Sequence, residues 1–258
     1  MKRIRRSIPG VDPRLLIKDA ARLMPDPTRR LFLRGAASLG ALTFLTGCDI
    51  LDDNGAENVL RKVSEFNDGV QAAIFRPNKL APVYPESAIT RPFPFNAYYS
   101  LDEAPEVDPA TYQLEVAGLV DNKKAWMLAE LNALPQVSQI TRHVCVEGWS
   151  AIGSWQGVQF SEFLKRIGAD TRARYVHFKC AEGYSNTIDM PSLLHPQTQL
   201  TLRYDNATLP RAYGFPIKIR MPTKLGFKQP KYVVAMEVTN TDKGGYWEDQ
   251  GYNWFSGL

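Results

Sequence analysis

Apolar positions follow two different periods along this chain. Between residues 56 and 75 they recur every three or four positions, which predicts an amphipathic helix packed onto the rest of the protein. After Thr111 the apolar runs become short, and turn residues separate them. This second pattern predicts strands at 112–116, 175–178, 200–204, 217–221 and 232–238.

Helical periodicity returns at two later places, residues 127–134 and 160–167. Two short helices among many strands do not give the regular alternation that a doubly wound sheet requires. We therefore predict an α+β fold with a mixed, strand-rich core and few helices. The segment 76–109 carries seven prolines, which exclude a long helix and indicate extended chain running over a surface.

The start of the chain has the features of an export signal. Arg29 and Arg30 open the sequence Arg-Arg-Leu-Phe-Leu-Arg, and the apolar run that follows over 35–47 is shorter than the roughly 20 residues that span a bilayer. This arrangement predicts a signal peptide for the twin-arginine translocase, which exports folded proteins. Leu-Thr-Gly directly before Cys48 predicts cleavage and lipidation at Cys48.

The leader also divides the chain and accounts for its charge. We expect a signal peptide over 1–47, a tether and N-terminal helix over 48–90, and one domain over 91–258. Residues 1–47 contain ten Lys and Arg against three Asp and Glu, so the remaining chain is slightly acidic. No basic run or zinc-ligand spacing follows Cys48, so nucleic-acid binding is not expected. Asp49 beside the lipidated cysteine predicts the periplasmic side of the inner membrane, with membrane contact through a lipid anchor only.

Several common active sites are excluded by missing residues. His143, His177 and His195 are the only histidines and form no His-Glu-x-x-His spacing, so a zinc hydrolase is not expected. The sequence Gly-Trp-Ser-Ala-Ile at 148–152 lacks the second glycine of a nucleophile elbow. The chain contains neither a glycine-rich phosphate loop nor a Cys-x-x-Cys-His motif for haem.

The stretch 141–150, Thr-Arg-His-Val-Cys-Val-Glu-Gly-Trp-Ser, is the best remaining candidate for chemistry. Arg142 and His143 flank Cys145 and would stabilise its thiolate, a soft ligand suited to a redox metal. Arg142 could also attract an oxyanion, or it could be a paired arginine at the edge of the core. A buried structural role for Cys145 remains open, because free cysteine is often buried. A thiol oxidoreductase that uses Cys145 and Cys180 is a further alternative.

The order of residues in this stretch favours one interpretation of Cys145, that of a metal ligand. Cys-Val-Glu-Gly-Trp-Ser at 145–150, with Trp-x-Gly-Val at 155–158, resembles the molybdenum-ligating segment of the sulfite oxidase superfamily, especially its bacterial exported branch. In that branch one cysteine thiolate and a single molybdopterin bind the metal. The resemblance therefore implies a molybdenum-molybdopterin cofactor with Cys145 as the protein ligand.

The resemblance continues in order over residues 91–258. Phe-Asn-Ala-Tyr-Tyr-Ser at 95–100 is similar to the Asn-x-x-Tyr segment that touches the pterin in this family, which implies contacts from Asn96, Tyr99 and Ser100. Cys180 stands where the methionine sulfoxide reductase branch has a threonine that contacts the cofactor. The resemblance thus implies a cofactor contact at Cys180 and excludes a disulfide to Cys145.

Two later segments resemble phosphate-binding parts of the family. Residues 209–218 match its Leu-Pro-x-x-(His or Asn)-Gly-x-Pro-x-Arg pattern, but Tyr213 replaces the His or Asn and Lys218 replaces the Arg. A lysine keeps the attraction to phosphate but loses bidentate geometry. Gly-Phe-Lys-Gln-Pro-Lys at 226–231 resembles the loop that holds the phosphate, which implies contacts from Gln229, Pro230 and Lys231.

The resemblance implies an envelope molybdenum oxidoreductase that catalyses oxygen-atom transfer, such as reduction of an S-oxide. Sulfite oxidation by the same fold and a cofactor-free envelope adaptor are the alternatives. Because the chain has no electron-carrier motif of its own, a b-type membrane cytochrome or a c-type cytochrome is the expected electron partner. The aromatic segment 244–254 is expected to close an edge of the core, although it could instead cover the pocket or contact the partner.

Overall fold

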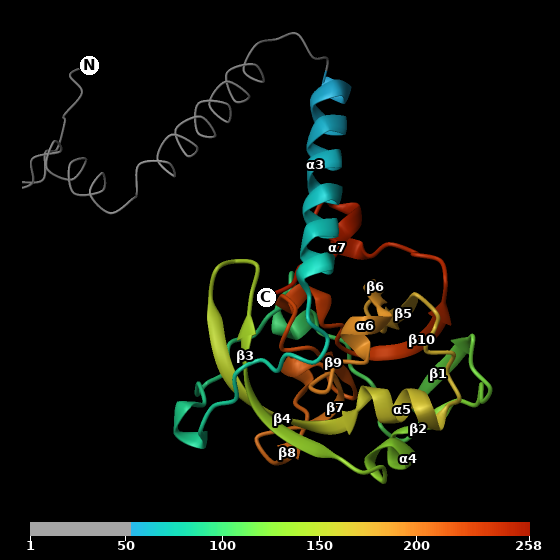
Figure 1. The fold of residues 1–258 in the computed structure, drawn as a ribbon. Helices are drawn as coiled ribbons and strands as arrows, with labels where there is room; N and C mark the ends of the chain where they lie inside the picture. Colours follow the sequence, from blue (N-terminus) through green and yellow to red (C-terminus); the bar gives the residue numbers. More distant parts are fainter. Residues whose placement is uncertain (1–52) are drawn as a thin grey trace, which may run out of the picture. The chain divides into compact units, whose positions relative to one another are not determined.

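The computed structural model describes residues 53–258, so the predicted signal peptide, Cys48 and the start of the tether lie outside the described residues. Residues 61–258 form one compact unit (Figure 1). Its strands are β1 (Gln113–Gly118), β2 (Trp126–Met127), β3 (Val137–Val144), β4 (Ser150–Gln159), β5 (Tyr175–Cys180), β6 (Ser185–Asp189), β7 (Gln199–Tyr204), β8 (Ala207–Thr208), β9 (Lys218–Arg220) and β10 (Val233–Thr239).

The helices of the described chain are few and mostly short. They are α3 (Asp53–Ile74), α4 (Leu128–Asn132), α5 (Phe160–Arg166), α6 (Met190–Leu193) and α7 (Tyr246–Asp249), with single 3₁₀ turns η1 (Glu86–Ala88), η2 (Leu101–Glu103), η3 (Arg211–Tyr213) and η4 (Gly226–Lys228). The predicted α+β class, strand-rich with few helices, is therefore confirmed.

The strands form two sheets. One sheet has the order β2-β1-β10-β5-β6, in which β1 and β10 are parallel and the other pairs are antiparallel. The other has the order β3-β4-β7-β8, and β9 also pairs with β7. Parallel pairing of β1 with β10 brings together segments that are far apart in sequence. The C-terminal part of the chain is thereby fixed to the first strand.

The core contains side chains from both sheets and from α5. Leu114 of β1, Phe178 of β5 and Leu200 of β7 belong to one buried cluster, together with Phe160 and Phe163 of α5. A burial pattern that alternates along β1 explains why its periodicity was visible in the sequence, since successive side chains of a strand point to opposite faces. Packing of the two sheets fixes the loops at their ends, where the candidate site lies.

Sequence periodicity located five of the ten strands within residues 53–258. The strands predicted at 112–116, 175–178, 200–204, 217–221 and 232–238 correspond to β1, β5, β7, β9 and β10 within about two residues. The long β3–β4 hairpin and β6 were missed as strands. In β3 the exposed and buried positions alternate only over residues 141–144 and not over 137–140, so the pattern typical of a half-buried strand is incomplete.

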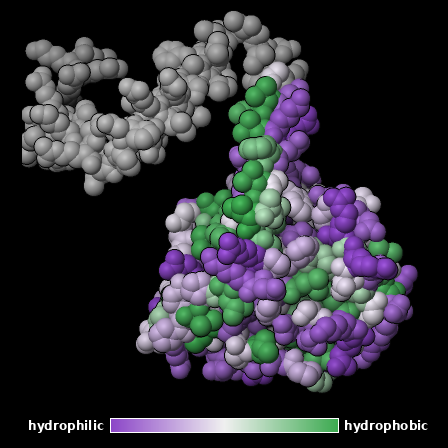
Figure 2. All heavy atoms as spheres, in the orientation of Figure 1, coloured by the Kyte–Doolittle hydropathy of each residue, from purple (hydrophilic) through white to green (hydrophobic). Residues whose placement is uncertain are grey.

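The N-terminal helix was predicted correctly, but the surface it packs with was not. Ser64, Asp68 and Gln71 on its polar side bond to the C-terminal residues, for example Asp68 Oδ1 to the Phe255 amide at 2.8 Å. The apolar stripe stays exposed instead of packing on the domain: Phe66 is 70% exposed and Ile74 71% (Figure 2). No helix among residues 53–258 is long and apolar enough to cross a membrane.

Gly118 tests the parallel β1–β10 pairing. It adopts φ +85°, and a Cβ atom there would lie 2.0 Å from the Val238 carbonyl oxygen. We expect Gly118→Ala to lower the free energy of unfolding by about 3 kcal/mol, because it adds a backbone collision to the left-handed strain. Gly183 has nearly the same φ, +84°, but open space around it. Gly183→Ala should therefore cost only about 1 kcal/mol in urea denaturation, and equal losses would contradict the role given to Gly118.

Candidate functional site

A cavity of about 790 Å³ of empty space lies at the loop ends of the two sheets. Its wall comes from the loop before η2, the β3–β4 turn, the β5–β6 turn, the η4 loop and the C-terminal segment that includes α7. Most residues that the sequence nominated line it, namely Asn96, Tyr99, Cys145, Lys218, Gln229, Pro230 and Lys231.

Cys145 sits in the tight turn that joins β3 to β4. The turn is closed by the Cys145 amide, which donates to the Trp149 carbonyl at 2.9 Å, and by the Gly148 amide, which donates to the Cys145 carbonyl at 3.2 Å. The thiol donates to Glu147 Oε2 at 3.6 Å, and the Trp149 indole donates to the same oxygen at 2.9 Å. Burial, aided by the Glu147 charge, raises the pKa of the Cys145 thiol.

The expected stabilisation of this thiolate by Arg142 and His143 is not supported. Alternation along β3 turns Arg142 to the exposed side of the strand, where its guanidinium lies over the Tyr84 ring, 5.6 Å from the centroid. His143 points inward but is buried among cations, and burial first and then Lys218 hold its pKa well below the ordinary value. A neutral imidazole provides no counter-charge. Within the protein, the backbone amides of Val146 and Glu147 act to lower the thiol pKa, and burial outweighs them.

Two lysines of the cavity wall form no ion pair within residues 53–258, although the Glu182 charge acts on one of them, Lys231. Lys218 is 4% exposed; its ammonium lies 5.0 Å from the Trp155 ring centroid and forms no hydrogen bond or ion pair within residues 53–258. Burial, with the nearby charges of Lys231 and Arg220, holds the pKa of Lys218 well below its usual range. Burial also lowers the pKa of Lys231 to about 8, and its ammonium donates to the Asn96 carbonyl at 2.6 Å. An anion in this cavity would satisfy both.

Asn96 and His143 form a close polar pair beneath the η4 loop. Asn96 Nδ2 donates to His143 Nε2 at 2.7 Å, which requires the tautomer of the neutral imidazole that carries its proton on Nδ1. Gly226 passes directly over them, and a Cβ there would lie 2.5 Å from His143 Nε2 and 2.8 Å from Asn96 Nδ2. Only a glycine allows the loop this approach. The motif glycine therefore brings the following Gln229, Pro230 and Lys231 to the cavity wall.

Several buried polar atoms at or next to the cavity lack a hydrogen bond of ordinary geometry among the described residues. They are the Tyr99 and Tyr232 hydroxyls, Glu182 Oε2 and His143 Nδ1, although Tyr99 lies close enough to Tyr232 and Glu182 to act on their pKa values. Burial raises the pKa of Glu182 to about 7, so this carboxyl holds a proton near neutrality. Buried polar groups are normally hydrogen-bonded, so their number here indicates a polar ligand. Sequence reasoning did not find Glu182.

Three nominated residues and Arg142 do not line the cavity. Ser100 is exposed and bonds to Glu103 at 2.9 Å. Tyr213 donates to the Phe93 carbonyl at 2.9 Å and packs in an aromatic cluster with Phe93, Trp155 and Tyr204. Cys180 is buried in the main core and is not bonded to Cys145. Direct cofactor contacts from these residues stay predictions, and their positions do not support them.

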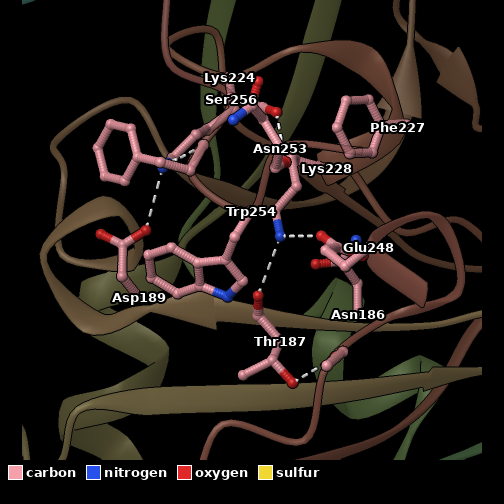
Figure 3. Close-up of polar contacts among 12 residues, drawn as sticks. Asn186, Thr187, Asp189, Lys224, Phe227, Lys228, Glu248, Asn253, Trp254 and Ser256 are labelled. Atoms are coloured by element: carbon pink, nitrogen blue, oxygen red, sulfur yellow. Dashed lines mark hydrogen bonds and ion pairs between the residues drawn. The ribbon is translucent and has the colours of Figure 1, made fainter. Parts of the chain in front are cut away.

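The η4 loop contains two further lysines, Lys224 and Lys228, which the sequence did not predict as site residues. Both form ion pairs inside the protein. Lys224 pairs with Asp189 Oδ1 at 3.1 Å and donates to the Phe255 carbonyl at 2.7 Å. Lys228 pairs with Glu248 of α7 and donates to the Thr187 carbonyl at 3.1 Å (Figure 3). These contacts tie the η4 loop to β6, α7 and the C-terminal residues. The segment 244–252 is thereby held against the cavity, and Trp247 and Tyr252 line it instead of only closing the core.

The donor set fits a molybdopterin. A thiol on the wall suits a soft redox metal, and unpaired buried ammonium groups suit a phosphate. The orphaned hydroxyls and carboxyl suit the polar edges of a pterin. No group of three His, Cys, Asp or Glu residues within 53–258 could form a metal site from protein side chains. A metal here would meet Cys145 and take its other ligands from outside the chain.

Comparison with known families decides the assignment. The model of the oxidoreductase molybdopterin-binding domain matches residues 102–247. The chain belongs to this family. It is accordingly a molybdopterin-dependent oxidoreductase of the sulfite oxidase type, as the motifs around Cys145 and Lys231 had implied.

Relatives agree with this assignment. A protein of Azospira oryzae, provisionally named protein-methionine-sulfoxide reductase subunit YedZ1, is 62% identical over 240 residues, covering 93% of this chain and 92% of that protein. The protein-methionine-sulfoxide reductase catalytic subunit MsrP of Ralstonia nicotianae is 29% identical and matches 54% of this chain, but only 47% of its own length. The match to MsrP thus spans about half of that relative.

The fold also has a solved counterpart. The sulfane dehydrogenase SoxCD of Paracoccus pantotrophus superposes with a TM-score of 0.51 over 54% of this chain and 41% of that one. At 16% identity the likeness concerns the fold alone. It agrees with the strand-rich molybdopterin-binding architecture.

Lys218 tests the reading of the cavity as an anion site. We expect Lys218→Met to raise the free energy of unfolding of the cofactor-free protein by about 1 to 2 kcal/mol, because it removes an unpaired buried cation. The same change should lower the molybdenum content after expression with the cofactor. Lys165→Met, at an exposed lysine, should change stability by less than about 0.5 kcal/mol and leave the molybdenum content unchanged. A destabilised Lys218→Met protein with full molybdenum content would contradict the assignment.

Proposed function

We propose that this oxidoreductase reduces an S-oxide, such as methionine sulfoxide, at a molybdenum centre ligated by Cys145. The observation that carries the proposal is the position of the Cys145 thiol on the wall of a cavity that also presents Lys218 and Lys231 without anionic partners. The names of the Azospira and Ralstonia relatives support the substrate class.

In this proposal the protein binds and orients while the cofactor reacts. When bound, a molybdenum-molybdopterin would supply two-electron oxygen-atom transfer. Cys145 would be the one protein ligand. Lys218 and Lys231 would neutralise the phosphate, and Asn96, Tyr99, Gln229 and Pro230 would position the pterin. Neutral His143 would keep Asn96 in place through their 2.7 Å contact.

The residues around the thiol favour reduction of an S-oxide over oxidation of sulfite. Reduction converts R₂S=O, two electrons and two protons into R₂S and water. Glu182 lines the cavity with a pKa near 7, so it is suited to pass protons. Sulfite is an anion and needs positive charge beside the metal, but Cys145 is followed by Val146 and Glu147, and Arg142 faces away. The two lysines of the cavity are assigned to the cofactor phosphate in this proposal, so they are not free to bind sulfite. Sulfite oxidation and a cofactor-free adaptor remain the alternatives that the assay below distinguishes.

Electrons would come from a separate protein. The sequence has no haem-attachment or iron–sulfur cysteine motif, so a b-type membrane cytochrome or a c-type cytochrome is the proposed donor. The leader supports export by the twin-arginine translocase and a lipid anchor at Cys48 on the periplasmic face of the inner membrane. Such an anchor would hold the enzyme beside a membrane donor.

Purified protein from a host that makes molybdopterin tests the chemistry. With a reduced dye, it should reduce methionine sulfoxide and show negligible sulfite oxidation. Cys145→Ala should lose the activity, the visible charge-transfer absorption and all but about a tenth of an equivalent of molybdenum, because it lacks the ligand. Cys180→Ala is the control and should keep the metal. Wild-type protein without molybdenum would support the adaptor, and sulfite turnover would reverse the direction proposed.

Fractionation of cells tests the location. Arg29→Lys with Arg30→Lys should leave the protein in the cytoplasm, because the twin-arginine signal is removed. Cys48→Ala should still allow export but release the mature protein from the membrane fraction or leave its precursor uncleaved. Incorporation of a labelled fatty acid into the wild-type protein measures lipidation directly. Unlabelled protein that remains membrane-bound would contradict the anchor.

A further inference from the structure

Four aromatic side chains gather at the mouth of the cavity, and we call Tyr98, Tyr246, Trp247 and Tyr252 the aromatic collar. The rings of Tyr98 and Tyr246 are stacked, with centroids 4.9 Å apart and planes at 12°. Trp247 meets both of them edge-on, at 5.7 and 5.2 Å, and lies 4.9 Å from Tyr252. Tyr98, Trp247 and Tyr252 line the same cavity as Cys145.

The collar is not a closed part of the core. Tyr98 is 47% exposed, Tyr246 37% and Tyr252 38%, whereas Trp155, at the centre of the other aromatic cluster, is fully buried. Aromatic rings that pack against each other and still face solvent leave apolar area uncovered. Such a surface at a cavity mouth marks a place where a ligand binds.

The collar is also held in position before any ligand arrives. Buried Lys228 pairs with Glu248 of α7 and donates to the Thr187 carbonyl, and the Thr187 hydroxyl donates to the Gly244 carbonyl at 2.7 Å (Figure 3). Both ends of the segment that carries Tyr246 and Trp247 are therefore fastened. A fixed apolar surface binds a ligand without the entropic cost of ordering a loop.

The cavity has walls of two kinds. Cys145, Glu147 and Glu182 give it polar groups, while the collar supplies the π faces of Tyr98, Trp247 and Tyr252. An alkyl methyl sulfoxide has the same division, with a polar S–O bond at one end and apolar carbons on the sulfur. Sulfur and its methyl group make favourable contacts with aromatic rings. Sulfite has no apolar part and would gain nothing from the collar.

Resting on the S-oxide reduction proposed above, we propose that the aromatic collar is the substrate-binding subsite for the sulfur and alkyl arm of an alkyl methyl sulfoxide. The S–O oxygen enters toward Cys145, and the alkyl arm lies against the solvent-facing surfaces of Tyr98 and Trp247. These two residues thus determine which S-oxides bind, and they take no part in the oxygen transfer itself.

Binding to the oxidised holoenzyme tests the collar without turnover. With N-acetyl-methionine sulfoxide methylamide as the probe, Trp247→Leu and Tyr98→Leu should each weaken the Kd by about 5- to 10-fold in calorimetry, because they keep apolar volume but remove the ring. The KM of the dye-driven reaction should rise in parallel while kcat stays within about twofold. Trp254→Leu is the matched control, since Trp254 belongs to the same C-terminal segment but does not line the cavity.

Three results would overturn the collar. The first is an unchanged Kd in both variants, and the second is an equal loss in Trp254→Leu. The third is a normal Kd with slower electron delivery from a cytochrome, which would make the collar a partner surface. Failure of the proposed function is a separate result, since wild-type holoenzyme would then bind the probe but fail to reduce it. Wild-type holoenzyme that does not bind the probe would overturn the collar as well. Two variants on different segments guard against misfolding of either.

Discussion

Buried positive charge is the constraint on which the rest of this structure depends. Removing an ammonium group from water costs several kcal/mol unless a partner offsets it, and one loop with its preceding strand buries three lysines and half-buries a fourth, Lys231. Lys224 and Lys228 meet carboxylates, and these pairs fasten the loop to β6 and α7. Lys218 and Lys231 form no ion pair with a carboxylate, so a ligand would have to offset the cost of desolvating their ammonium groups. Two lysines of this region therefore stabilise the fold, and two are available for binding.

This division explains how the site is assembled from distant parts. The Lys228–Glu248 pair joins the η4 loop to α7. The same ion pair therefore positions the residues that would hold the cofactor and those of the aromatic collar. Arg220 extends the network across the other sheet, where it donates to the Arg142 carbonyl at 2.6 Å and to Gln229 Oε1 at 2.8 Å. The strand that leads to Cys145 is therefore tied to the loop that faces it.

The sequence correctly predicted site residues that lie in short motifs. It was wrong about residues whose role depends on the direction in which the side chain points. Asn96, Cys145 and Lys231 lie in short ordered motifs, and each reaches the cavity. Arg142 was nominated because it is near Cys145 in sequence, but alternation along β3 turns it outward. Glu182 escaped notice because an isolated glutamate in a turn has no pattern to mark it. Its significance comes from burial beside Tyr99 and Tyr232.

By itself the sequence determined the strand-rich class, the likeness to a molybdopterin-binding family and the thiolate candidate, because periodicity and motif order are local properties of the chain. Only the tertiary structure decided which lysines form internal ion pairs and which are available to bind an anion. It also decided that the apolar stripe of α3 stays exposed. It also decided that the C-terminal aromatics line the cavity mouth. Desolvation and charge pairing depend on contacts between residues far apart in sequence, and no local pattern specifies those contacts.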